Sequence, residues 1–163
     1  MGIVNSHSAL VSSENEKWGT PTKLFNKLHE YYHFDIDVCA SDFNHKLDNY
    51  YTEQDDALKQ DWAPLTCWMN PPYGRGINKW FEKAYNEASK GATVVALVRV
   101  PSIGTSYHIE YGIYAKHIFI PGRLHFEDDK RNPSKSAAPF SSMLLIWDKE
   151  TIKQNNVNIL GGI

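Results

Sequence analysis

Cysteine is scarce in this chain, and neither sign of charge dominates. Of the 163 residues only Cys39 and Cys67 are cysteines, and neither belongs to a CxxC pair or stands beside paired histidines. This excludes a framework of several disulfides, so we expect reduced thiols and no metal site. The 17 Lys and Arg residues face 19 Asp and Glu residues, which gives a net charge of −2. Any site for a polyanion must therefore be a local patch of charge.

Long hydrophobic targeting runs and the common nucleotide-binding loops are missing as well. Residues 1–17 are rich in Ser, Asn and Glu and hold no long apolar core. We expect them to form a flexible N-terminal segment, and we expect a cytoplasmic protein that does not contact membranes. Neither GxGxxG nor GxxxxGK followed by Ser or Thr occurs. This argues against a dinucleotide site and against a P-loop.

Apolar residues recur alternately at helical and at strand spacings. The helices that this pattern predicts are Thr22–Tyr32, a segment from Ile77 to a glycine cap at Gly91, and a short one within Thr105–Ala115. The predicted strands are His33–Val38, Leu65–Met69, Ala92–Val98, His117–Ile120, Arg123–Phe126 and Phe140–Trp147. The stretch Asp42–Ala63 is polar, and its periodicity is too weak to divide it.

Strands that alternate with helices early and gather late predict an α/β fold. We expect a doubly wound, mostly parallel sheet with an antiparallel C-terminal edge. One domain over residues 18–150 accounts for this pattern, followed by a polar tail, 151–163, that we predict to be mobile. The polar insertion Glu127–Pro139 separates the last two strands and is too long for a tight hairpin.

The most informative motif is Asn70-Pro71-Pro72-Tyr73, directly after the apolar run Leu65–Met69. Asparagine supplies a side-chain acceptor, and each proline fixes its own φ and restricts the residue before it, so the acceptors point in a set direction. Tyr73 adds a flat aromatic face. These are the groups needed to hold a planar amino group for alkylation. The alternative is a proline-rich turn after a strand.

A second marked strand end is Asp37-Val38-Cys39-Ala40-Ser41. An acid followed by small residues could take the ammonium and ribose hydroxyls of a nucleoside-amino-acid cofactor, since open α/β sheets bind ligands outside the carboxyl ends of their strands. The alternative is an acidic residue that caps the next helix, and from these five residues alone that alternative is favoured.

Several blocks in a fixed order resemble one family. They are Trp18-Gly19-Thr20-Pro21, Phe34–Ser41, Asp61-Trp62, Trp68–Gly74, Gly122–Phe126 and Ala138–Ser142. Together they are similar to the small phage-type DNA N6-adenine methyltransferases, the Dam-like family, over nearly all of Trp18–Trp147. Arg99-Val100-Pro101 departs from a family stretch in which the proline precedes the arginine.

The resemblance implies a Rossmann-like methyltransferase fold and a site-specific DNA-methyltransferase that acts on adenine with S-adenosylmethionine as cofactor. By similarity, Trp18 and Thr20-Pro21 lie by the methionine carboxylate, and Asp61 lies by the cofactor adenine. Asp37, Cys39, Ala40 and Ser41 lie by the methionine or ribose, and Asn70 also borders the cofactor.

The chemistry of such a reaction assigns roles to Asn70, Pro71, Pro72 and Tyr73. The N6 lone pair is delocalised into the adenine ring, so it becomes nucleophilic only when it is held out of conjugation. The Asn70 side-chain oxygen and the Pro71 carbonyl can each accept one N6 hydrogen, which aims the lone pair at the methyl donor. The base must leave the duplex stack, and Tyr73 is the residue expected to stack on it.

DNA contact must come from local cations. Arg75 and Lys79 flank the predicted base site, and Arg123, Lys130 and Arg131 lie before and within the late insertion. The expected partners are DNA and, as one option, a second copy of the chain in a homodimer. The alternatives are a methyltransferase for RNA adenine or a protein glutamine amide, or a noncatalytic nucleic-acid-binding relative.

Overall fold

The structure, a computed structural model, describes residues 18–100 and 104–154. The predicted flexible segment 1–17 and residues 155–163 of the predicted tail lie outside the described residues.

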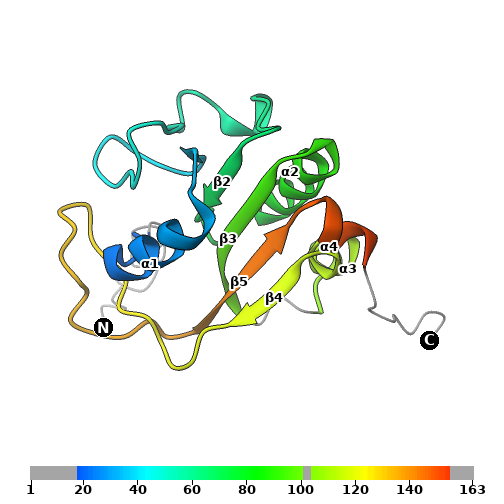
Figure 1. The fold of residues 1–163 in the computed structure, drawn as a ribbon. Helices are drawn as coiled ribbons and strands as arrows, with labels where there is room; N and C mark the ends of the chain where they lie inside the picture. Colours follow the sequence, from blue (N-terminus) through cyan, green and yellow to red (C-terminus); the bar gives the residue numbers. More distant parts are fainter. Residues whose placement is uncertain (1–17, 101–103, 155–163) are drawn as a thin grey trace, which may run out of the picture.

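The strands form one mixed sheet in the order β1-β2-β3-β5-β4 (Figure 1). Their bounds are Ile36–Asp37 for β1, Thr66–Met69 for β2, Thr93–Val100 for β3, Lys116–Phe119 for β4 and Ser141–Trp147 for β5. β1, β2 and β3 are parallel, whereas β5 is antiparallel to both of its neighbours. An α/β fold is therefore confirmed.

The position of the antiparallel strand differs from the prediction. β5 does not form the edge but lies between β3 and β4, and β4 is the edge strand. The apolar β5 pairs with β3 along nearly its whole length, from Val94↔Trp147 to Val100↔Ser141. This central place buries both faces of β5, in which every residue from Ser142 to Trp147 is buried. The more polar β4, with exposed Lys116 and Phe119, is suited to an edge.

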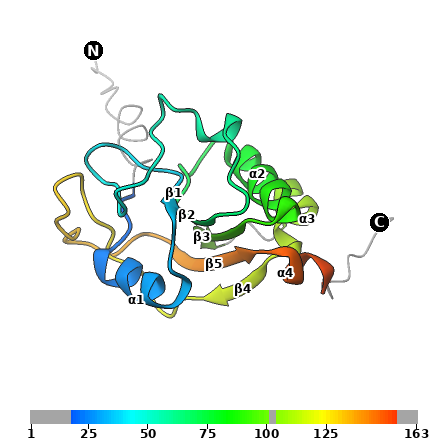
Figure 2. The same cartoon turned by 45° about the horizontal axis from the view of Figure 1, so that its top comes forward.

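Helices cover both faces of the sheet, as Figure 2 shows with α1 on one side and α2 and α3 on the other. Their bounds are Thr22–Tyr32 for α1, Ala57–Lys59 for the 3-10 helix η2, Ile77–Lys90 for α2, Ser106–Glu110 for α3, Gly112–Tyr114 for the 3-10 helix η3 and Lys149–Lys153 for α4. Val94, Ala96 and Val98 of β3 face α2, and Val95 and Leu97 face the α1 side. The prediction of a central strand buried on both faces is confirmed.

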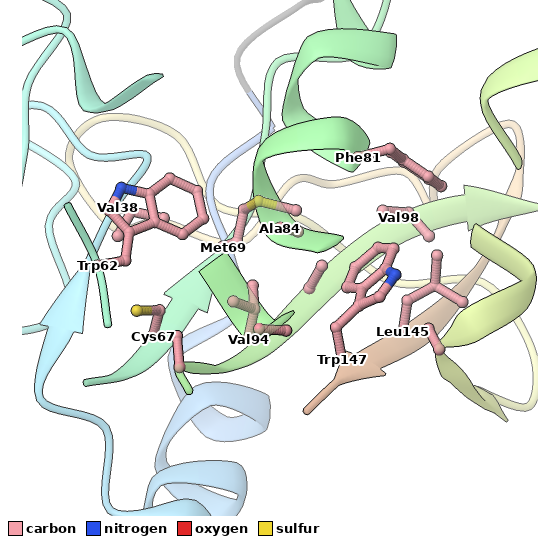
Figure 3. Packing of buried hydrophobic residues seen from close by; sticks show 14 of the residues in the cluster. Val38, Trp62, Cys67, Met69, Phe81, Ala84, Val94, Val98, Leu145 and Trp147 are labelled. Atoms are coloured by element: carbon pink, nitrogen blue, oxygen red, sulfur yellow. The ribbon is translucent and has the colours of Figure 1, made fainter. Parts of the chain in front are cut away.

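The core on the α2 side is the larger of the two. Val98 packs there with Phe81 of α2 and Trp147 of β5, as Figure 3 shows, and all three are at most 2% exposed. Burying a large apolar side chain of this kind contributes about 1.5–3 kcal/mol. This packing holds α2 against the sheet, directly after the turn of residues 70–76.

The predicted helices agree with the structure. α1 spans the predicted Thr22–Tyr32, and α2 ends at Gly91, whose φ of 125° is one that glycine adopts easily. The predicted strand His33–Val38 is shorter. His33 ends α1 with a φ of 53°, and only Ile36–Asp37 is assigned to β1.

One strand prediction toward the C-terminal end is wrong. Arg123–Phe126 forms no strand, because its carbonyls accept isolated hydrogen bonds from Ser134 and Ala138 instead of a continuous ladder. The predicted tail boundary at residue 151 falls inside α4. Asp148 and Thr151 form a capping box at the start of this helix, and Ile152 packs against the α2-side core.

Candidate active site

The two strand ends singled out in the sequence lie side by side. The register Asp37↔Trp68 between β1 and β2 brings the residues after Asp37 next to those after Met69. The Cys39 sulfur lies at the backbone N–H of Asn70, and burial and the Asp37 carboxylate raise the pKa of Cys39 well above its usual value. The carboxyl ends of adjacent parallel strands therefore form one cluster, as expected for a ligand site of an α/β sheet.

The side-chain amide of Asn70 is held in one orientation. Its Nδ2 donates to the Trp18 carbonyl at 2.6 Å and to Thr20 Oγ1 at 3.1 Å. The Tyr73 hydroxyl lies 3.3 Å from Asn70 Oδ1. With both amide hydrogens used, the oxygen is the group that remains to accept a hydrogen from a ligand.

Tyr73 is more enclosed than the sequence suggests. Its side chain belongs to an aromatic cluster and is 7% exposed, with Phe126 and Phe140 in edge contact with its ring at centroid distances of 6.4 and 5.6 Å. Its hydroxyl is 3.3 Å from the Leu97 carbonyl, and burial raises the pKa of the phenol. Tyr73 is therefore a neutral phenol whose ring face is covered by protein.

Asp37 shapes the loop that follows β1. Its carboxylate is 3% exposed and accepts the backbone N–H groups of Cys39 at 3.3 Å and Lys46 at 3.1 Å. Burial raises the pKa of Asp37 to about 6, although these two N–H groups act in the opposite direction. In the structure Asp37 thus binds backbone N–H groups of the following loop, and no helix begins within residues 38–56 for it to cap.

The segment 18–21, which precedes α1 in the sequence, lies beside the same cluster. Thr20 is 3% exposed, and Gly19 exchanges two backbone hydrogen bonds with Glu127, of 3.1 and 2.8 Å. Pro21 precedes α1 without a side-chain cap. Ala40 donates its N–H to the Tyr51 carbonyl, and Ser41 closes a turn through the Asn44 side chain.

Asp61 does not join these residues. Its side chain is 89% exposed and lies 3.5 Å from Lys90, at the C-terminal end of α2. Trp62 leads through Leu65 to the amino ends of β2 and β3, where Thr93 donates to the Leu65 carbonyl. The structure therefore places Asp61 at the opposite end of the sheet from Asn70.

A pocket of about 370 Å³ adjoins the Asn70–Tyr73 turn on the α2 side. It is lined by Tyr73, Gly74, Arg75, Ile77, Phe81, Val98, Arg99 and Tyr107. The pocket joins a largely apolar wall to two guanidinium groups. Lys79 is exposed in the first turn of α2, between the lining residues Ile77 and Phe81 but not itself in the lining.

The cations of the late segment are spread over an exposed loop. Arg123 and Lys130 are exposed, and Arg131 donates from its guanidinium to the His45 carbonyl at 3.1 Å. Figure 1 shows this loop, drawn in yellow to orange, beside α1. The loop therefore borders the segment after β1 rather than extending away from the domain.

Sequence reasoning missed Lys46 and Glu127, whose side chains are 2.8 Å apart and at most 10% exposed. They are 81 positions apart and lie outside helices and strands, so no periodicity links them. The one available signal is that Glu127 directly follows the block Gly122–Phe126.

Within residues 18–100 and 104–154, no three or more His, Cys, Asp or Glu side chains are grouped so that they could hold a metal ion. None of the helices described there is both long and apolar enough to cross a membrane.

Residues 7–160 match the family described as DNA N-6-adenine-methyltransferase (Dam). The chain belongs to this family, and the resemblance seen in the sequence is confirmed.

Two phage proteins named DNA N-6-adenine-methyltransferase are similar to this chain. The protein of Haemophilus phage HP1 (strain HP1c1) is 33% identical over 90 residues, which cover 54% of this chain and 52% of the phage protein. The protein of Escherichia phage T1 is 33% identical over 60 residues, which cover 36% of this chain and 25% of that protein. The chain thus spans about half the length of the first relative and a quarter of the second.

Proposed function

We propose that this protein methylates N6 of adenine in DNA with S-adenosylmethionine as the methyl donor. The observation that carries the proposal is the Asn70 amide, fixed at the junction of two strand ends with its oxygen left as the acceptor. Membership of the Dam family and the names of the two phage relatives point to the same substrate.

In the proposed reaction the turn after β2 prepares the nucleophile. Asn70 Oδ1 and the Pro71 carbonyl each accept one N6 hydrogen, which draws the lone pair out of conjugation with the ring. Pro71 and Pro72 keep these acceptors in place because their φ angles are fixed. When bound, S-adenosylmethionine supplies an electrophilic methyl group on a sulfonium sulfur. As the new N–C bond forms, the methyl–sulfur bond would break with its electron pair left on sulfur, and N6 would release one of its two protons to solvent.

The loop after β1 and the segment 18–21 are the proposed holders of the cofactor. The buried Asp37 carboxylate has a pKa of about 6, so a nearby cation stabilises its ionised form. The cofactor carries two such cationic groups, an ammonium and a sulfonium. Trp18, Thr20, Pro21, Cys39, Ala40 and Ser41 complete this proposed site. Asp61 is not part of it, because it lies at the other end of the sheet.

The DNA side of the proposal requires a flipped base, since a base within a duplex stack cannot reach Asn70. Arg75, Lys79, Arg123, Lys130 and Arg131 are the proposed phosphate or base contacts. Stacking of the flipped adenine on Tyr73 would require its aromatic neighbours Phe126 and Phe140 to open locally.

The test is incubation of the protein with cofactor labelled in its methyl group, together with DNA, RNA and a protein mixture. Mass spectrometry should find the label as N6-methyladenine in DNA, and at equal incubation time it should find far less with Asn70→Ala. Label in RNA or in a glutamine amide would reassign the acceptor. Cofactor and DNA binding without label in any acceptor would identify a noncatalytic relative.

A further inference from the structure

One ion pair joins three parts of the chain beside the candidate active site. Lys46 Nζ lies 2.8 Å from Glu127 Oε2, with side chains 6% and 10% exposed. The Glu127 carboxylate also accepts the Thr22 N–H at 2.5 Å and the Thr22 hydroxyl at 2.8 Å. Lys46 donates to the same hydroxyl at 2.9 Å. Glu127 therefore replaces the N-terminal cap that α1 lacks locally, from a position 105 residues away.

The main chain of Glu127 holds the preceding residues as well. Its N–H and carbonyl both pair with Gly19, and a Cβ on Gly19 would lie 2.5 Å from the Glu127 oxygen. Residues 18–22 are thus held by Glu127 at two points, Gly19 and Thr22. The Asn70 amide donates to two acceptors in this segment. They are the Trp18 carbonyl, which directly precedes Gly19, and the Thr20 hydroxyl, which lies between Gly19 and Thr22.

Lys46 extends the connection to the other strand end. Its backbone N–H donates to Asp37 Oδ2 at 3.1 Å, while its ammonium contacts Glu127. The Lys46–Glu127 pair therefore touches both the segment that orients Asn70 and the loop that Asp37 shapes. No other ion pair within the described residues joins these two segments.

We propose that Glu127 is a positioning residue for Asn70. By holding residues 18–22 against the turn after β2, it keeps the two acceptors in place and so presents Asn70 Oδ1, rather than Nδ2, to the amino group of the substrate. If the Asn70 amide could flip by 180°, one of its two orientations would present the donor Nδ2 to the amino group of the substrate, which is also a donor. The inference rests on the proposed function for the identity of that amino group, but the orientation of the Asn70 amide can be measured without it.

The charge of Glu127 supports this role. Burial alone would raise the pKa of Glu127, but the hydrogen bonds from Lys46 and Thr22 outweigh burial and lower it. Glu127 is thus ionised at neutral pH and holds its two partners through charge-assisted hydrogen bonds.

The kinetic test is the single-turnover methylation rate at saturating cofactor and DNA, at a temperature where circular dichroism shows each variant to be folded. Glu127→Ala should be slower by about tenfold to a hundredfold, as expected for a reacting group displaced by about 1 Å. Glu127→Gln keeps one acceptor for Thr22 and should regain part of the rate. Glu30→Gln, an exposed site on α1, is the matched control and should equal the wild type.

A second readout separates positioning from mere stability. The Asn70 side-chain amide signals, assigned in NMR spectra by their loss in Asn70→Ala, should shift or broaden in Glu127→Ala and in Lys46→Met and stay unchanged in Glu30→Gln. In a double-mutant cycle, the effects of Lys46→Met and Glu127→Gln on the logarithm of the single-turnover methylation rate should be less than additive. If Glu127→Ala does not fold, Glu127→Gln and Lys46→Met give the same comparison.

Wild-type rates in the folded Glu127 variants, or a slower rate with unchanged Asn70 signals, would overturn the inference. The wild-type protein could methylate no acceptor while the Asn70 signals still change when Glu127 is substituted. That result would reject the proposed function and leave the positioning role standing.

Discussion

At the scale of single residues, the Asn70 amide and the Asp37 carboxylate differ in what they offer a ligand. Asn70 is half-buried; its amide hydrogens are already used, and its oxygen, to which the Tyr73 hydroxyl donates at 3.3 Å, can accept one further hydrogen. Asp37 is almost fully buried and uses both of its oxygens to bind backbone N–H groups. The first side chain is suited to the reacting amino group and the second to a nearby positive charge.

Asn70→Ala should slow methylation by about a hundredfold or more, because it removes one of two oriented acceptors in the transition state. Cofactor affinity should change little. Tyr73→Phe keeps the aromatic ring and should retain most of the activity, although it removes the 3.3 Å contact with Asn70 Oδ1. Rapid-quench kinetics for chemistry and calorimetry for binding check both statements. A wild-type rate in Asn70→Ala would mean that the tetrapeptide is only a turn.

Cofactor affinity should depend on pH through Asp37. Because the pKa of Asp37 is about 6, the carboxylate is mostly ionised at pH 7 and mostly protonated at pH 5. If the ionised form is the one that binds the cationic cofactor, affinity at pH 5 should be about tenfold lower than at pH 7. Calorimetry at the two pH values measures this difference. Asp37→Asn should bind weakly and equally at both, and an unchanged pH dependence in this variant would remove Asp37 from the cofactor site.

At the scale of elements, Glu87 of α2 ties this helix to the segment before β2. Its side chain is 1% exposed, and it accepts from the backbone of Trp62 and Ala63 and from the ammonium groups of Lys83 and Lys90. Burial raises the pKa of Glu87, but these bonds outweigh burial and lower it from 4.5 to about 2. The ionised carboxylate therefore stabilises the packing of α2 on the sheet.

Glu87→Gln should lower the free energy of unfolding at pH 7 by about 3 kcal/mol, since each unit of pKa shift corresponds to about 1.4 kcal/mol. Because the folded-state pKa is depressed, this stabilisation is present above pH 4.5 and is lost as pH falls toward 2. The unfolding free energies of the wild type and the variant in urea should thus approach each other as the pH falls from 4.5 to about 2. Glu30→Gln is the surface control. Equal unfolding free energies at pH 7 would contradict the role given to Glu87.

At the scale of the whole molecule, a net charge of −2 leaves the proposed DNA binding to a local surface. The proposed surface lies at the carboxyl ends of β1 to β3, where Arg75 borders the pocket and the loop that carries Lys130 and Arg131 contacts the segment after β1. The amino ends of the same strands carry Asp61 and the start of α4 instead.

Binding to DNA without cofactor should be weak and strongly salt-dependent, because phosphate contacts dominate such binding. Lys130→Glu combined with Arg131→Glu should lower the affinity and reduce the slope of log affinity against log salt by about two units. Lys149→Glu with Lys153→Glu makes the same change of charge on exposed α4 at the opposite end. Fluorescence anisotropy over a salt series compares the two pairs, and equal losses would argue against a local DNA surface on this loop.

The helices and the α/β class could be read from the sequence because both depend on local periodicity. α1 and α2 follow apolar stripes, and Gly91 ends α2 where the sequence predicts it. The strand order could not be read, because an apolar run such as β5 carries no information about which neighbour it pairs with. Arg123–Phe126 was misread for a similar reason, since an apolar ring such as Phe126 can enter an aromatic cluster without strand pairing.

The sequence by itself determined the Asn70-Pro71-Pro72-Tyr73 turn and its position after a buried strand, because proline restricts the backbone wherever it occurs. The tertiary structure alone decided the orientation of the Asn70 amide, the burial of Asp37 and Tyr73, and the distance of Asp61 from the cluster. The bonds that fix the Asn70 amide and its two acceptors join residues 50 to 105 positions apart, from Asn70 with Thr20 to Glu127 with Thr22. Such contacts form only when packing brings the segments together, so no local pattern records them.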